Sequence, residues 1–119
     1  MMELVSQGSF SDAHETAAIP LIAANLHRAV RPEQSQIWAV LRAGDSSNRI
    51  FYSIISTFLG RMCLSGDIYD LSDAQWALVE QGMHFYGMAS DIIRDGITVK
   101  CEYSTAQYNH CLLYTSRCV

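Results

Sequence analysis

The chain has 119 residues, of which 50% are apolar and 17% charged, so it is long and apolar enough to fold around one buried core. With 8 Lys and Arg against 12 Asp and Glu, its formal net charge of -4 excludes the basic surface that nucleic-acid binding requires. The N-terminus lacks the order of a signal peptide and no apolar run approaches the roughly 20 residues of a membrane span, so we expect neither a nucleic-acid nor a membrane partner.

The N-terminal part predicts the end of a strand and then a helix. Residues 3–6 are apolar at their centre and lead into a polar loop at residues 7–11. Because the chain reaches this loop so early, we expect Met1 to be an internal methionine of a longer protein. In residues 16–30 the apolar side chains recur at helical spacing, and Pro20 stands near the first turn, where a helix tolerates it.

A strand, a helix and a second strand are expected next. Residues 36–41 (QIWAVL) form a continuous apolar run that is typical of a strand buried on both faces. The following helix begins after Asp45 or Ser46, of which we favour Asp45 as the N-cap, and it ends at Gly60. Residues 61–65 (RMCLS) then predict another short buried strand.

The third helix has the clearest local signal. Ser72 and Gln75 form an S-x-x-Q capping box, which predicts a helix start, and Gly96 predicts its end. The side chains expected on its apolar face are Trp76, Val79, Met83, Tyr86 and Ile93. Residues 97–103 alternate between apolar and polar side chains, which predicts a strand that opens a new all-β unit.

The last nine residues, 111–119, read CLLYTSRCV. This segment resembles the translation of a transposon-end sequencing adapter joined to its own reverse complement. We therefore expect it to be non-native and the natural sequence to stop near His110. The four cysteines of the chain form no CxxC pair and have no histidine at ligand spacing, so the sequence predicts no metal site.

The order strand then helix, repeated along the chain, predicts an α/β fold with parallel strands and right-handed crossovers. Both a barrel and a doubly wound sheet have this order. A parallel sheet of only three strands would leave edges unpaired and apolar surface uncovered. We therefore expect further strands upstream.

Candidate catalytic groups stand where the expected strands end, because enzymes with parallel strands carry their active sites at the carboxyl ends. The segments concerned are residues 6–15, 42–46 and 65–70, and each contains an aspartate. In the first segment Ser11 and Asp12 begin the sequence SDAHE, and Asp12 is either a general acid/base or the N-cap of the next helix. Residue type alone favours the cap.

The remaining candidates also have structural alternatives. Asp67 either orients a substrate hydroxyl or holds a turn, and Asp70 competes with Ser72 to cap the third helix. Trp38 has the shape to stack on a sugar, but its position in a buried strand favours core packing. For these residues the sequence favours the structural role.

Four segments together resemble the end of the catalytic barrel in the melibiase clan of α-galactosidases: SDAHETAAIPLI, QSQIWAVLR, RIFYSIISTFLGRMCLSGDIYDLSDAQW and FYGMASDIIRDG. The resemblance implies that residues 1–96 are the last three strand–helix units of a TIM (β/α)8 barrel and that residues 97–110 begin a β-sandwich domain. It also implies a retaining glycosidase that removes terminal α-linked galactose from oligosaccharides and needs no metal or organic cofactor.

The clan uses two aspartates, a nucleophile on an earlier strand and an acid/base in an SD motif. Ser11 and Asp12 match the SD motif, so the resemblance implies that Asp12 is the acid/base and that Ser11 and Asp67 bind substrate. A slide of about three residues would place Ser9 there instead. We prefer Asp12 because only a carboxyl group can donate and recover the proton.

The nucleophile motif of the clan, a strand that ends in K-x-D, does not occur in the 119 residues. Because a retaining glycosidase needs both carboxyl groups, this chain is expected to be inactive by itself. Two alternatives stay open. One is another α-glycosidase or an N-acetylgalactosaminidase of the same clan, and the other is a non-catalytic α/β module that binds a ligand or partner at its strand ends.

Overall fold

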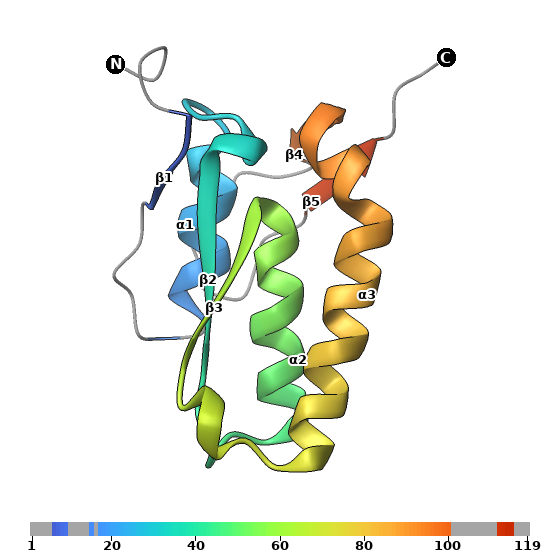
Figure 1. Ribbon diagram of the computed structural model, residues 1–119. Helices are drawn as coiled ribbons and strands as arrows, with labels where there is room; N and C mark the ends of the chain where they lie inside the picture. The colour runs from blue at the N-terminus through green and yellow to red at the C-terminus, as the bar shows by residue number, and fades with distance from the viewer. Residues whose placement is uncertain (1–5, 10–14, 16, 101–111, 116–119) are drawn as a thin grey trace.

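The computed structural model describes residues 6–9, 15, 17–100 and 112–115, in which short strands alternate with helices (Figure 1). The first three strands are β1 (Gly8–Ser9), β2 (Ser35–Leu41) and β3 (Arg61–Gly66), and the α-helices are α1 (Ala18–Leu26), α2 (Ser47–Ser56) and α3 (Asp73–Asp95). These three strands are parallel and lie side by side in the order of the sequence. The predicted α/β class and the parallel strands are therefore confirmed.

The central strand, β2, pairs with both neighbours. It pairs with β1 from Gly8↔Ser35 to Ser9↔Gln36 and with β3 from Gln36↔Arg61 to Leu41↔Gly66. The loop expected at residues 7–11 is wrong at Gly8 and Ser9, which form β1. Pairing with β2 sets its limits, and local sequence does not show that pairing. Of the segment predicted as a strand, residues 3–5 lie outside the described residues.

One face of β2 is buried under the helices. Ile37, Ala39 and Leu41 alternate along the strand and are at most 1% exposed. Ile19 and Ala23 of α1 pack against Ile37 in one apolar cluster. Through this contact α1 packs against the first half of β2.

The other two helices cover the second half of the same face. Ile50 and Ile54 of α2 and Val79 of α3 join Ala39 and Leu41 in a second cluster. α1 packs on α2 and α2 packs on α3, so the helices form one layer beside the sheet (Figure 1). Right-handed crossovers between strands that neighbour each other in sequence order produce this one-sided arrangement.

The opposite face of β2 corrects two predictions. Gln36, Trp38 and Val40 are only partly buried, so the strand is not buried on both faces. The indole Nε1 of Trp38 donates a hydrogen bond to Ser9 Oγ at 2.8 Å, and the ring is not a core side chain. Because the described helices cover one face of the sheet, buried and partly buried side chains alternate along β2.

The helix ends follow the prediction in part. α1 is shorter than the expected 16–30, because the chain turns after Leu26. The N-cap of α2 is Ser46 and not Asp45, since Ser46 Oγ accepts a hydrogen bond from the backbone N–H of Arg49. A 3-10 turn (Thr57–Leu59) extends α2 up to Gly60, where the prediction ended the helix.

The start of α3 is confirmed. Ser72 is its N-cap and forms the capping box with Gln75, so Asp70 does not cap the helix. Val79 and Ile93 are buried as expected, whereas Met83 is 49% exposed and does not belong to the buried face. The predicted apolar face of α3 is therefore correct for Val79 and Ile93 and wrong for Met83.

After α3 the structure describes two further strands that pair with each other. β4 (Ile97–Lys100) pairs antiparallel with β5 (Leu112–Thr115), so a strand begins where the alternation predicted it. β5 falls within the segment expected to be non-native, and the origin of that segment stays a prediction. Among the described residues no helix is both long enough and apolar enough to cross a membrane.

Candidate functional site

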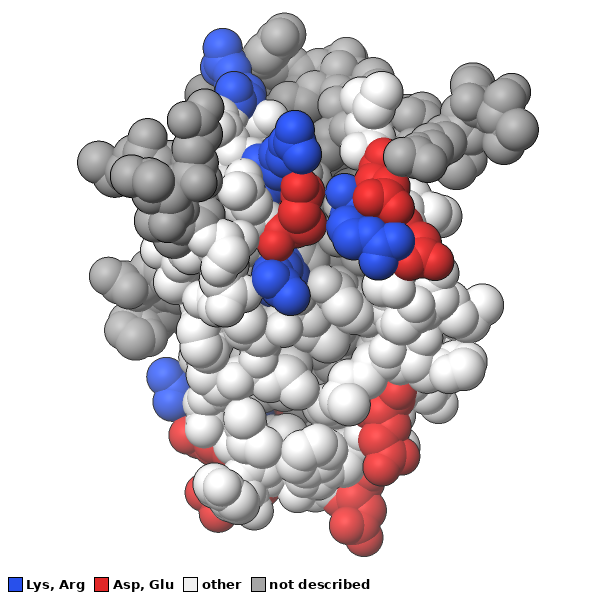
Figure 2. Space-filling model, turned by 45° about the horizontal axis from the view of Figure 1, so that its top comes forward, with Lys and Arg blue, Asp and Glu red and all other residues white. Residues whose placement is uncertain are grey.

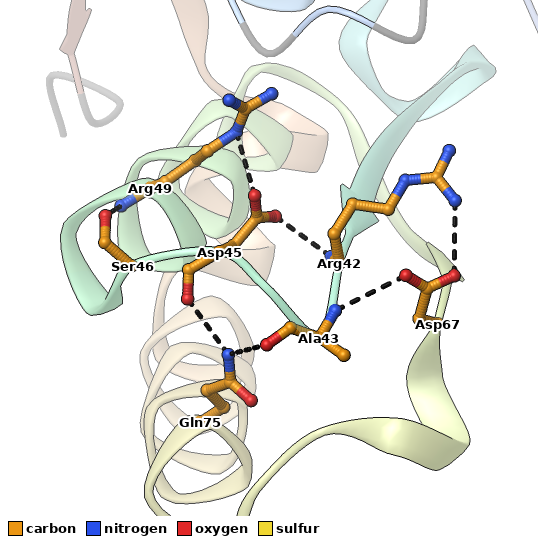
Figure 3. Close-up of polar contacts among 7 residues, drawn as sticks. All are labelled: Arg42, Ala43, Asp45, Ser46, Arg49, Asp67 and Gln75. Atoms are coloured by element: carbon orange, nitrogen blue, oxygen red, sulfur yellow. Dashed lines mark hydrogen bonds and ion pairs between the residues drawn. The ribbon is translucent and has the colours of Figure 1, made fainter.

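The carboxyl ends of β2 and β3 meet at the lower edge of the sheet in Figure 1, and polar side chains gather there (Figure 3). Arg42 follows β2 and Asp67 follows β3. Arg42 Nη1 lies 3.2 Å from Asp67 Oδ1, and the backbone N–H of Ala43 donates to Asp67 Oδ2 at 3.4 Å. These two bonds link the ends of neighbouring strands.

Gly66 makes the close approach of these strand ends possible. Its φ of 99° lies in the left-handed region that favours glycine. A Cβ at this position would stand 2.0 Å from Leu41 O, which is far inside contact distance. The backbone N–H of Asp67 donates to the same Leu41 oxygen at 2.8 Å. The turn therefore holds Asp67 against the end of β2.

Asp45 has a structural role in the loop between β2 and α2. Its Oδ2 accepts a hydrogen bond from the backbone N–H of Arg42 at 2.9 Å, and its Oδ1 lies 3.1 Å from Arg49 Nε. The side chain is only 8% exposed. Asp45 thus closes the loop with both oxygens and is not open to a ligand, while Ser46 caps the helix.

Gln75 ties the start of α3 to the same loop (Figure 3). Its Nε2 donates to Ala43 O and to Asp45 O, both at 3.0 Å. Its Oε1 accepts from the backbone N–H of Ser72 at 2.8 Å. Sequence reasoning identified the capping box but missed the two contacts across the loop, because the partners lie about 30 residues away and no local pattern signals them.

Of the two aspartates that bond Arg42 at this edge, Asp67 is the more accessible. Its side chain is 39% exposed, against 8% for Asp45. The ion pair with Arg42 and the N–H of Ala43 fix its orientation, and carboxylate oxygens can accept further hydrogen bonds. A fixed and exposed acceptor at the carboxyl end of a parallel strand is suited to bind a ligand hydroxyl.

The other predicted site residues, Ser11 and Asp12, lie outside the described residues. The described strand that precedes them, β1, ends at Ser9, and the alternative site residue Ser9 accepts the hydrogen bond from Trp38. The structure therefore brings together Arg42 and Asp67 from the sequence-predicted segments and leaves the acid/base assignment a prediction.

Cys63 is not an activated nucleophile. It lies on β3 opposite Trp38, and burial raises the pKa of its thiol, an effect that the nearby Arg61 only partly offsets. A raised pKa favours the neutral thiol over the nucleophilic thiolate. In the part of the chain that the structure describes, no group of three or more His, Cys, Asp or Glu side chains could hold a metal ion.

Two other ion pairs of the described residues lie away from the carboxyl ends of β2 and β3. Arg31 pairs with Glu33 and Arg94 with Asp91, and these exposed pairs stand before β2 and at the end of α3. In Figure 2 blue and red atoms lie close together in the upper half of this face, and white atoms separate them from the red atoms at its lower rim. Exposed ion pairs of this kind contribute little to stability.

Comparison with known proteins adds no family to this description. No family model, no curated protein and no solved structure matches the chain.

Proposed function

We propose that this chain is the C-terminal part of the catalytic barrel of a retaining α-galactosidase of the melibiase clan. In this proposal the whole enzyme hydrolyses terminal α-linked galactose from oligosaccharides, with Asp12 as its general acid/base. Ser11 and Asp67 bind the substrate. The chain by itself is inactive, because the proposed nucleophile belongs to a strand upstream of Met1.

The single observation that carries the proposal is the arrangement of the parallel strands. β1, β2 and β3 follow each other in sequence order, and α1, α2 and α3 form one layer beside them. A (β/α)8 barrel repeats such a unit, which supports the proposal, and its substrate site lies at the carboxyl ends of its strands. One half of a doubly wound sheet has the same unit. The SD motif follows β1 within three residues of sequence, and Asp67 follows β3 directly.

The proposed chemistry needs two carboxyl groups. In the first step a carboxylate attacks the anomeric carbon while the carboxyl group of Asp12 gives its proton to the leaving glycosidic oxygen. In the second step Asp12, now a carboxylate, takes a proton from water as the water oxygen displaces the enzyme carboxylate from the sugar. Asp67 accepts a hydrogen bond from a sugar hydroxyl in this scheme.

The alternatives predict other features. A doubly wound binding module would carry helices on both sides of its sheet, beyond a point where the strand order reverses. Another α-glycosidase of the clan would share the strands and differ in the substrate it prefers. Activity on a panel of α-glycosides separates these alternatives.

The test is an assay of the longer gene product on α-galactosides, beside the variant Asp12→Ala. We expect kcat/KM on a natural oligosaccharide to fall by roughly 100-fold or more, the contribution of a general acid/base. Activity should recover on an aryl galactoside with a good leaving group, because such a group departs without a proton from the enzyme.

Ser9→Ala is the matched control, since it changes the alternative residue three positions away. If Ser9→Ala abolishes activity and Asp12→Ala does not, the assignment of Asp12 is wrong. If the longer protein hydrolyses no α-glycoside, the binding module becomes the better explanation.

A further inference from the structure

The side chain of Gln75 lies between the start of α3 and the loop that joins β2 to α2 (Figure 3). It is only 8% exposed, and its Nε2 donates to Ala43 O and to Asp45 O, both at 3.0 Å. Its Oε1 accepts from the backbone N–H of Ser72 at 2.8 Å. An amide nitrogen has two N–H groups, so both are used within the protein and Gln75 acts on the loop and not on a ligand.

The loop that Gln75 holds supplies both contacts of the Asp67 carboxylate. The backbone N–H of Ala43 donates to Asp67 Oδ2 at 3.4 Å, and Arg42 Nη1 lies 3.2 Å from Asp67 Oδ1. The backbone of Arg42 is itself fixed, because its N–H donates to Asp45 Oδ2 at 2.9 Å. Gln75 therefore fastens, at two carbonyl groups, the segment that orients Asp67.

We propose that Gln75 is a positioning residue, which acts through the β2–α2 loop to hold the Asp67 carboxylate in the orientation that binds a galactose hydroxyl. This inference rests on the proposed α-galactosidase function, in which Asp67 binds the substrate. The side chain of Asp67 is 39% exposed, so water competes with its partners and a displaced loop would release it. A buried amide that bonds the loop supplies the support that a precise binding geometry needs.

Two substitutions at the start of α3 separate this role from the capping of the helix. Gln75→Glu keeps an oxygen for the backbone N–H of Ser72, because glutamate also forms a capping box, but it places a second oxygen against two carbonyl groups. Ser72→Ala removes the capping hydroxyl and leaves both loop bonds of Gln75. Gln75→Met lacks the amide and adds no charge, so it replaces Gln75→Glu if that variant does not fold.

The test measures the Kd of galactose for the longer enzyme by calorimetry, beside the unfolding temperature of each variant. We expect Gln75→Glu to raise this Kd about 10-fold, the effect of weakening a hydrogen bond to a charged group. Ser72→Ala should change the Kd less than about twofold, although loss of the cap lowers stability. Asp67→Ala should also raise the Kd, and Gln75→Glu should then add less than about twofold, because residues that act as one unit are not additive.

Three results would overturn the positioning role while the wild-type enzyme still binds galactose and hydrolyses α-galactosides. One is an equal loss of galactose affinity in Gln75→Glu and Ser72→Ala, which would leave Gln75 a role in stability alone. Another is a full additional loss from Gln75→Glu in the Asp67→Ala background, and the third is an unchanged Kd in Asp67→Ala. A wild-type protein that neither binds galactose nor hydrolyses an α-galactoside would instead overturn the proposed function, and the role of Gln75 with it.

Discussion

The helix-covered side of the sheet and its carboxyl edge are built in different ways. Between sheet and helices, apolar side chains such as Leu41, Ile50 and Val79 are fully buried, and Gly82 lets α3 approach Ile54. At the carboxyl edge the contacts are hydrogen bonds and an ion pair around partly exposed loops. Close packing supplies stability, and the edge supplies side chains whose positions are fixed but whose atoms remain accessible.

The largest expected effect comes from truncation of a buried side chain on the helix side. Ile50→Ala should lower the free energy of unfolding by about 2–5 kcal/mol, because it removes buried methyl groups and leaves a cavity. Ile55→Ala, on the same helix but 40% exposed, should cost about 1 kcal/mol. Urea unfolding of both variants measures the difference. Equal losses would show that α2 does not bury the face assigned to it.

Two glycines of α3 should respond in opposite directions. A Cβ on Gly82 would stand 2.3 Å from Ile54 Cγ2, so Gly82→Ala should lower the free energy of unfolding by about 1–3 kcal/mol. A Cβ on Gly87 meets nothing within 4 Å, so Gly87→Ala should raise it by up to about 1 kcal/mol through helix propensity. Stabilisation by both changes would contradict the close contact of α2 with α3.

Within the carboxyl edge, the two aspartates should differ in their effect on stability. Asp45→Asn should cost about 1–3 kcal/mol of unfolding free energy, since Asp45 is nearly buried and bonded to Arg42 and Arg49. Asp67→Asn should cost less than about 1 kcal/mol, because its ion pair is exposed. Thermal unfolding compares them. A larger loss at Asp67 would make that residue structural and weaken its proposed contact with substrate.

The sequence predicted best what neighbouring residues decide. The capping box of Ser72 and Gln75 spans a single turn, and the structure contains it. The choice between Asp45 and Ser46 was wrong because both side chains can cap a helix, and Asp45 instead bonds Arg42 and Arg49, three and four residues away. These bonds are local, but residue type alone does not show which of the two side chains turns toward the helix start.

The same limit applies to the site. The carboxyl-edge segments followed from the parallel strands, but the link between Arg42 and Asp67 depends on the register of β2 with β3. The contacts of Gln75 with the β2–α2 loop depend on how α3 docks.

The central proposal is that β1, β2 and β3 belong to a larger barrel with a two-carboxylate site. The most direct measurement is the experimental structure of the longer gene product. We expect an upstream parallel strand on the free edge of β1, and a K-x-D aspartate with its carboxyl group about 5–5.5 Å from that of Asp12, the separation of a retaining glycosidase. An open sheet with helices on both faces, or no carboxylate near Asp12, would contradict the account.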